Sequence, residues 1–331
     1  MYNITHLKTP PLSEHKCLLI ICVSVFFFIV TGCNQLPMSD SERISELGKP
    51  PANAVLWSPV DRNRILVSAG YLDFSEGEIY ILDIETGTKQ IIASTERGML
   101  FAETWSPDGK SVVVSAFKDT KGFEQGGLWM IDLESGDITY ILTETINNII
   151  WDPWQESFIF TRIQKYNEGK DAVEIVSRDI KTNAESVIFA AEENEEILGY
   201  SLSPNGQQLA FSMGEAGLPM DNFEIYILNM SSGLVDRITS GGDNKYPIWS
   251  PTGDTIVYQK KTTEGKNDIY SFYLINPNNS CTVQLLESDF LLPPTWSPDG
   301  NLLAFIEPNA NGIFVLDIKD FLMGDYENRC Q

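Results

Sequence analysis

The sequence Trp-Ser-Pro-Asp-Gly stands at residues 105–109 and 296–300 and recurs in altered form four more times. The prolines of the six copies are 48, 46, 51, 47 and 47 residues apart, which indicates one structural unit repeated six times. Pro presets the first angle of a tight turn and Gly accepts the positive φ at its end, so each copy predicts a turn between two strands. The altered copies are Trp57-Ser58-Pro59, Trp151-Asp152-Pro153, Leu202-Ser203-Pro204-Asn205-Gly206 and Trp249-Ser250-Pro251-Thr252-Gly253.

Sequences typical of β-strands follow each turn. A β-rich run such as residues 112–114 comes directly after every copy, and in most repeats a second run, such as residues 128–132, comes about 15–20 residues later. Ser-Gly or Thr-Gly pairs then mark a turn into a further short strand, and no stretch between residues 52 and 318 has a sustained helical period. Four strands per repeat predict an all-β fold, a six-bladed β-propeller of four-stranded antiparallel blades over residues 51–331.

The outermost strand of the last blade is marked only weakly. The repeats leave this blade one strand short, so its fourth strand must come from another part of the chain. It comes either from residues 321–328 or from the N-terminal stretch before Pro51. Both alternatives remain open at the level of the sequence.

The repeats resemble the TolB-type propeller repeat, a relative of the WD repeat. The resemblance covers nearly all of residues 52–318 and is most specific at the complete motifs that begin with Trp105 and Trp296. It implies the propeller fold and says little about function, because one fold hosts many functions. TolB proteins carry a sizeable N-terminal domain before the propeller, whereas here residues 34–50 separate the first blade from Cys33.

The N-terminus has the pattern of an export signal. Two lysines precede fourteen uncharged residues at 17–30, which is too short for a bilayer-spanning helix of about 20 residues. Val30-Thr31-Gly32-Cys33 then resembles the lipobox of bacterial lipoproteins. We expect a lipoprotein signal peptide over residues 1–32, lipidation at Cys33 and a lipidated polar tether over residues 33–50. The protein would be exported and lipid-anchored to a cell-envelope membrane, facing the periplasm or the cell exterior; the alternative is an ordinary signal peptide with a chance cysteine.

The predicted mature chain is strongly acidic and has no histidine. Removing residues 1–32 takes away two lysines and one glutamate and lowers the net charge from −23 to −24. Such a charge repels nucleic acid and anionic lipid headgroups, so we expect no nucleic-acid partner. Both histidines, His6 and His15, lie in the removed segment. Their loss excludes Ser-His-Asp and Cys-His catalysis and the usual zinc sites, which need imidazole.

The sequence contains no recognisable signature of catalysis. It has no Gly-x-Ser-x-Gly elbow, no phosphate-binding glycine loop and no Cys-x-x-Cys pair. We therefore predict a protein that is not an enzyme and has no organic cofactor. A structural divalent cation stays open, and the sequence identifies no ligands for it.

Two cysteines of the mature chain remain besides Cys33. Cys281 follows a turn and should open the outer strand of blade five, and Cys330 ends a tail that must return near blade six. Export would place both where thiols oxidise. The alternatives are a disulfide between Cys281 and Cys330 or two free or intermolecular thiols.

The recurring polar and aromatic residues of the repeats have a structural interpretation. Asp108, Asn205 and Asp299 stand inside the turns, where their side chains can accept hydrogen bonds from nearby backbone. We therefore interpret them as turn-forming rather than metal-binding. The tryptophans before the turns are interpreted as packing between neighbouring blades rather than as a sugar platform; they are Trp57, Trp105, Trp151, Trp249 and Trp296.

The topology of a blade predicts where a ligand binds. Neighbouring strands are antiparallel, so the short repetitive turns share one face, and the connections between second and third strands and between blades share the other. We call the second face the loop face; variable loops on a rigid frame are the usual place for binding. The predicted acidic residues of this face are Asp73, Glu76, Asp119, Glu124, Glu168, Asp171, Glu215, Asp221 and residues 192–196. Near the mouth of the central channel, the innermost strands add Phe101, Glu103, Asn147, Asn148, Tyr200, Lys245 and Tyr246 as candidate binding residues.

These features favour a binding or scaffold protein that engages a protein or peptide, one carrying basic residues, through the acidic loop face. The alternative is an enzyme that acts on carbohydrate or a small molecule with channel carboxylates such as Glu103, since paired carboxylates hydrolyse glycosides without histidine. Two carboxylates about 5–10 Å apart in one funnel would favour the enzyme. An inert structural role in the envelope is a third alternative, and the sequence does not specify the oligomeric state.

Overall fold

The structure is a computed structural model of the chain. It describes residues 41–46, 51–71, 75–117, 120–123, 125–142, 149–165, 171–215, 222–265 and 267–326. All of them belong to one compact unit that spans residues 34–331. The predicted signal peptide, Cys33, Asn147, Asn148 and Cys330 lie outside the described residues. Within the described ranges, every helix falls short of the length and apolar character that a membrane crossing requires.

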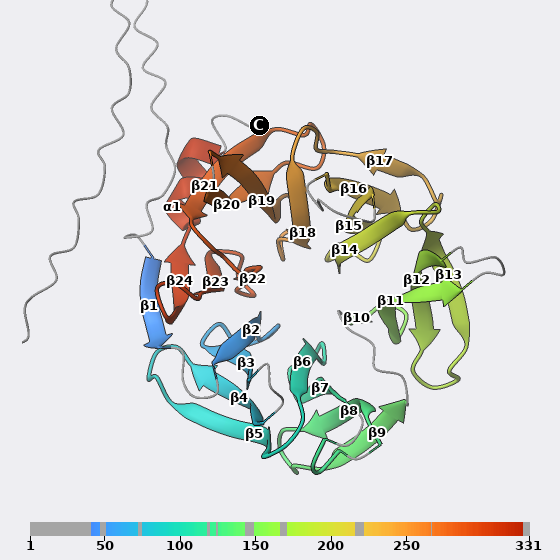
Figure 1. Cartoon of the computed structure of the whole chain (residues 1–331), viewed down its shortest axis with the longest axis vertical. Helices are drawn as coiled ribbons and strands as arrows, with labels where there is room; N and C mark the ends of the chain where they lie inside the picture. The colour runs from blue at the N-terminus through green and yellow to red at the C-terminus, as the bar shows by residue number, and fades with distance from the viewer. Residues whose placement is uncertain are drawn as a thin grey trace, which may run out of the picture. The chain divides into compact units, whose positions relative to one another are not determined.

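Six four-stranded antiparallel sheets stand around a common centre (Figure 1). In the first five sheets the order of the strands in space follows the order in the sequence, with the first strand innermost. The predicted six-bladed β-propeller is therefore confirmed. Blade one holds β2 (Ala52–Trp57), β3 (Arg64–Gly70), β4 (Gly77–Asp83) and β5 (Lys89–Thr95); blade two holds β6 (Leu100–Trp105), β7 (Ser111–Ala116), β8 (Gly127–Asp132) and β9 (Ile138–Leu142); blade three holds β10 (Ile150–Asp152), β11 (Ser157–Lys165), β12 (Asp171–Asp179) and β13 (Glu185–Ala190).

The next two blades repeat this order, and the sixth draws on both ends of the propeller. Blade four holds β14 (Glu195–Leu202), β15 (Gln208–Glu215), β16 (Glu224–Asn229) and β17 (Val235–Arg237); blade five holds β18 (Asp243–Trp249), β19 (Ile256–Glu264), β20 (Asn267–Ile275) and β21 (Thr282–Ser288); blade six holds β22 (Thr295–Trp296), β23 (Leu302–Glu307), β24 (Gly312–Asp317) and β1 (Ser41–Glu46).

The N-terminal strand closes the ring. β1 pairs antiparallel with β24, with Ser41 opposite Leu316 and Glu46 opposite Gly312 (Figure 1). Of the two alternatives for the last outer strand, the N-terminal one is confirmed. The prediction of a polar tether over residues 33–50 is accordingly wrong for residues 41–46. The edge of β24 would otherwise leave backbone groups unpaired, and the backbone of β1 pairs with them.

Residues 321–326 are helical and do not form a strand. The short helix α1 (Lys319–Phe321) continues into the wider helical turn η2 (Leu322–Tyr326). Phe321 and Tyr326 are each 6% exposed and pack into an apolar cluster with residues of blades five and six. The helical turn thus buries both aromatic side chains against the two blades.

Most of the core lies between neighbouring blades. One apolar cluster joins Val67 of blade one to Ala304 of blade six, and another joins Ile81 of blade one to Val114 of blade two. The second strands of the blades are the most deeply buried; every residue of β23 is buried. Each blade therefore depends on its neighbours, and the ring holds the innermost strands in place.

Two of the repeated tryptophans link adjacent blades through their indole nitrogens. Nε1 of Trp105 donates to the carbonyl oxygen of Leu56 in the preceding blade at 3.1 Å, and Nε1 of Trp296 donates to that of Ile248 at 3.1 Å. For these residues the interpretation as inter-blade packing is confirmed. The Nε1 of Trp57 instead donates to the carbonyl oxygen of Arg62 within its own turn, but the ring packs in the apolar cluster that joins blades one and six.

The repeated turns are stabilised by their own side chains. Ser106 Oγ donates to Asp108 Oδ1 at 2.6 Å, and Gly206 closes its turn with a φ of +69°. A Cβ on Gly206 would lie 2.5 Å from the Trp154 ring of the preceding turn, so both the backbone angle and a close approach require glycine. The turn-forming interpretation is confirmed at all three polar positions, since Ser203 and Ser297 donate to Asn205 and Asp299 at 2.8 and 2.6 Å as Ser106 does to Asp108.

Candidate functional site

A cavity of about 390 Å³ lies where the innermost strands meet. Its size falls within the range of about 300–1,000 Å³ typical of ligand sites. The walls are mainly apolar, with a few polar groups that converge on the space. Every blade contributes to the lining, which is Asn53, Ala54, Val55, Leu56, Ala102, Glu103, Ile149, Ile150, Gly199, Tyr200, Ser201, Tyr246, Pro247, Ile248, Leu292, Pro293, Pro294, Thr295 and Ile306.

Irregularities in the innermost strands direct these side chains. The pairing of β6 with β7 skips Glu103, and the pairing of β2 with β3 skips Asn53. β14 and β18 have register shifts next to Tyr200 and at Tyr246. A bulge breaks the strict alternation of a strand and re-aims a side chain, which is why bulges are common at binding sites.

Glu103 and Tyr200 are two of the polar residues in the cavity wall. Ser115 Oγ donates to the Glu103 carboxylate at 2.5 Å, and the backbone N–H of Ile149 donates to it at 3.5 Å. Tyr200 is 7% exposed and is hydrogen-bonded with Thr161. Burial raises the pKa of Tyr200, and the nearby charge of Glu103 raises it further, so the phenol stays neutral and can donate a hydrogen bond.

Tyr246 and Gly199 meet on the wall formed by β14 and β18. Tyr246 has a φ of +54° and Gly199 a φ of +69°. A Cβ on Gly199 would lie 2.7 Å from Cδ1 and 2.9 Å from Cα of Tyr246, so a larger residue does not fit without movement. Burial, followed by the charge of Asp243, raises the pKa of Tyr246. The glycine therefore fixes the place of the tyrosine in the cavity.

The structure brings together three of the seven candidate binding residues, Glu103, Tyr200 and Tyr246. Phe101 and Lys245 do not line the cavity, and their side chains make contacts elsewhere. The Phe101 ring meets the Phe117 ring edge-on at 5.8 Å. Lys245 Nζ forms an ion pair with Asp243 at 2.7 Å and lies 4.9 Å from the Phe223 ring. Asn147 and Asn148 lie outside the described residues.

Several lining residues were not singled out from the sequence. Asn53 and Thr295 face the cavity, and Asn53 Oδ1 has no hydrogen-bond partner within the described part of the chain. A sequence signal exists, because the cavity residues stand one to four positions before the Trp or Leu that opens each turn motif. The signal is weak, because the bulges differ between blades and the inward-facing position therefore differs as well.

The acidic character of the loop face is described only in part. Among its predicted residues, Asp73, Asp119, Glu124, Glu168 and Asp221 lie outside the described residues. A pocket of about 280 Å³ on this face is lined by Lys260 and Lys261 together with the glycines that connect blades four and five. The described part of the loop face therefore carries lysines as well as carboxylates.

Cys281 is disulfide-bonded. It lies directly before β21 and packs against the apolar cluster that also holds Tyr326 of the C-terminal helical turn. All other cysteines of the chain, including Cys330, lie outside the described residues. The oxidised state of Cys281 thus agrees with the sequence-based alternative of a disulfide, and its pairing with Cys330 stays a prediction.

Six sheets around one cavity define this chain as a six-bladed β-propeller. Its sequence is similar to that of the Tol-Pal system protein TolB of Wolinella succinogenes, with 25% identity over 188 residues that cover 55% of this chain and 41% of that protein. A family model described as "Eukaryotic translation initiation factor eIF2A" matches residues 27–126.

Solved structures agree on the fold. TolB from Acinetobacter baumannii superposes with a TM-score of 0.57 at 20% identity, covering 80% of this chain and 62% of that chain. An oligogalacturonate lyase in complex with manganese has a TM-score of 0.53 at 16% identity, covering 80% and 73%. Together with the sequence match, these likenesses identify a TolB-type propeller. The chain spans less than two thirds of either TolB, and the structural likenesses by themselves show only the fold.

Proposed function

We propose that this protein is an exported, lipid-anchored scaffold that binds a protein or peptide at the loop face and in the central cavity. The observation that carries the proposal is the cavity itself, where Glu103, Tyr200 and Tyr246 are among a few polar side chains in a mainly apolar wall. Such a combination of apolar walls and a few placed polar groups is the usual form of a binding site. The likeness to TolB, named as a protein of the Tol-Pal system, supports a role in assembly with other envelope proteins.

The chemistry of the cavity favours a basic group with apolar neighbours. Glu103 supplies a negative charge, and the apolar walls include Ile149, Ile248 and Leu292. The charge of −24 on the predicted mature chain attracts a basic partner from a distance. A lysine, arginine or free amino terminus inserted from a partner would meet the Glu103 carboxylate while its stem packs against the apolar walls.

The alternative of a carboxylate enzyme has weaker support. Hydrolysis of a glycoside by paired carboxylates requires two acids about 5–10 Å apart. In the described lining of the cavity, Glu103 stands without a second carboxylate. The likeness to an oligogalacturonate lyase rests on the fold alone. Binding therefore remains the function that the geometry supports best.

The proposal is tested by capture from a cell-envelope extract of the organism that makes the protein. Immobilised residues 34–331 are compared with two variants: Glu103→Gln, which removes the cavity charge and keeps the shape, and Glu134→Gln, which changes an exposed carboxylate in a turn of the opposite face. We expect Glu103→Gln to reduce capture of the partner about tenfold and Glu134→Gln to leave it unchanged. Equal capture by all three proteins would refute the role of the cavity.

A further inference from the structure

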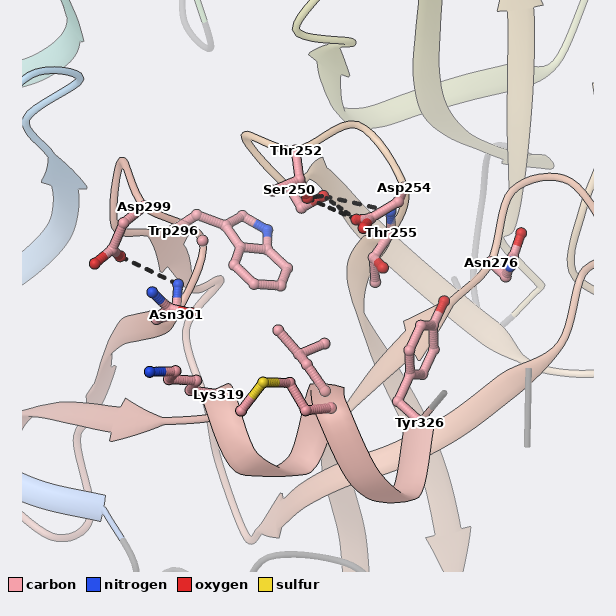
Figure 2. A pocket seen from close by; sticks show the side chains of 13 residues that line it. Ser250, Thr252, Asp254, Thr255, Asn276, Trp296, Asp299, Asn301, Lys319 and Tyr326 are labelled. Carbon is pink, nitrogen blue, oxygen red and sulfur yellow. Dashed lines mark hydrogen bonds between the residues drawn. The ribbon is translucent and has the colours of Figure 1, made fainter. Parts of the chain in front are cut away.

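A third pocket lies on the face opposite the loop face, between blades five and six (Figure 2). Its volume is about 210 Å³, and the C-terminal helical segment closes one side. At about 30 Å³ for each water of the liquid, the space is too large for one ordered water and suits a single small ring. The lining is Ser250, Thr252, Asp254, Thr255, Asn276, Trp296, Asp299, Gly300, Asn301, Lys319, Leu322, Met323 and Tyr326.

The pocket exists because blade six departs from the repeat. In blades one and two the third strand ends in an Asp that opens a hairpin, as Asp83 does by accepting from the N–H groups of residues 85 and 86. Asp317 begins the same turn by accepting from the N–H of Lys319 at 3.0 Å. The chain then continues into α1 and η2, since β1 supplies the fourth strand of this blade. The helical segment therefore stands where the hairpin would be and forms a wall of the pocket.

The buried hydroxyl of Tyr326 faces the pocket beside the side chain of Thr255. Tyr326 is 6% exposed, and its hydroxyl makes no hydrogen bond of normal geometry within the described residues, although it lies near Thr255 (Figure 2). A buried polar group without a partner costs free energy that a ligand can recover. Trp296 presents its indole to the same space, and its Nε1 is engaged by Ile248 of blade five, so the ring is fixed.

The charged residues of the lining are two carboxylates and one ammonium, and one of the carboxylates is paired by an arginine outside the lining. Asp254 and Asp299 supply two negative charges, and Lys319 in the lining and Arg62 beside it supply two positive ones; Arg62 Nη1 lies 3.2 Å from Asp299 Oδ2. Burial acts to raise the pKa of Asp299, but hydrogen bonds from Ser297 and Asn301 outweigh it and lower the pKa, so this carboxylate stays charged. Because Arg62 pairs with Asp299, the lining keeps, among the described residues, one unpaired charge of each sign, on Asp254 and Lys319, and so favours a ligand with hydroxyl groups over a simple anion or cation.

We propose that this pocket binds one neutral, polyhydroxylated ring, a monosaccharide or one unit of a neutral glycan. The carboxylate of Asp254 can accept from ligand hydroxyls, while Tyr326 and Lys319 can donate to ligand oxygens. Trp296, Leu322 and Met323 offer apolar surface for the C–H faces of a sugar ring. A ligand with polar edges and apolar faces satisfies both parts of the lining.

The test measures binding of defined sugars to the purified protein, expressed from the full chain. Saturation-transfer NMR and calorimetry are run with glucose, galactose and N-acetylglucosamine as neutral probes, and with glucuronate and glucosamine as charged ones. We expect at least one neutral sugar to bind and both charged analogues to bind more weakly. A neutral di- or trisaccharide distinguishes a free monosaccharide from a glycan unit, because tighter binding of the longer probe indicates a glycan.

Variants connect binding to this pocket. Tyr326→Phe removes the hydroxyl alone and should weaken binding of the neutral sugar about 3- to 10-fold, the range for one neutral hydrogen bond. Lys319→Ala changes an exposed side chain and should weaken it similarly. The matched control is Tyr140→Phe, since the Tyr140 hydroxyl also lacks a partner in the described chain but lines none of the three pockets described above. The proposal is overturned if no neutral sugar binds, if a charged analogue binds more tightly, or if Tyr326→Phe and Lys319→Ala both bind as the unmodified protein does.

Discussion

Replacing Gly199 with alanine should destabilise the propeller more than the same change at Gly87. Both glycines have nearly the same backbone angle, with φ values of +69° and +70°. An alanine held in this left-handed conformation costs about 1–2 kcal/mol at either position. They differ in surroundings, because a Cβ on Gly87 would meet nothing within 4 Å, whereas one on Gly199 would lie 2.9 Å from the Tyr246 backbone.

The close approach adds a second cost at Gly199. Tyr246 resists displacement because it occupies a register shift of β18 and is itself at positive φ. Forcing an extra methyl group into such a contact costs about 1–3 kcal/mol. We therefore expect Gly199→Ala to lower the free energy of unfolding by about 2–5 kcal/mol and Gly87→Ala by about 1–2 kcal/mol.

The assay is urea unfolding followed by tryptophan fluorescence, with the two variants and the unmodified protein compared at one temperature. A lower midpoint at an unchanged slope reports a loss of stability without a change in the surface exposed on unfolding. Gly199→Ala should also reduce capture of the partner, since it moves Tyr246 in the cavity. Equal midpoints for the two variants would refute the close packing of Gly199 against Tyr246.

Three further predictions concern the cysteines and the turns. Cys281 and Cys330 should pair, so unmodified protein taken from its native compartment and denatured without reductant should show neither cysteine as a reactive thiol. Two reactive thiols in the unmodified protein would contradict the pairing. Cys281→Ser should lower the free energy of unfolding by about 2–4 kcal/mol. Cys33→Ser should abolish incorporation of labelled fatty acid and release the protein from membranes, and continued labelling would contradict the lipobox. Backbone hydrogen bonds in the turns, foremost from Thr86 to Asp83 and from Ser135 to Asp132, lower the pKa of both carboxyl groups. The stability that these two carboxylates contribute is present above the unfolded-state pKa of about 3.9 and is lost as the pH falls through the lower folded-state pKa. Replacing both Asp83 and Asp132 with Asn should therefore make the melting temperature fall less steeply as the pH is lowered into the acid range.

The fold could be predicted because its repeat is local. Four of the six turn motifs place Pro, a short polar residue and Gly in fixed order, and the strands that each motif joins are neighbours in the sequence. The closing strand β1 could not be chosen over residues 321–328, because its pairing with β24 joins the two ends of the propeller and its sequence, Ser-Glu-Arg-Ile-Ser-Glu, is polar. An edge strand buries few side chains, so its sequence carries little signal.

The candidate site was predictable in part for a related reason. Glu103 and Tyr200 stand two residues before the motif that opens each turn, and alternation along a strand directs both inward. Phe101 satisfies the same alternation, but the bulge at Glu103 interrupts it. Phe101 and Glu103 therefore do not both point into the cavity. The pocket at Tyr326 depends on a helical segment folding back onto two blades, a contact that no local pattern in the sequence encodes.

The most direct test of the central claim, that the cavity receives a partner, is photo-crosslinking in living cells. A benzophenone amino acid is placed at Ile150 in the cavity wall and, in a separate protein, at Glu134 in an exposed turn of the opposite face. We predict a discrete crosslinked partner from position 150, which is lost when Glu103→Gln is added, and none from position 134. A crosslink from position 134 with none from position 150 would contradict the account.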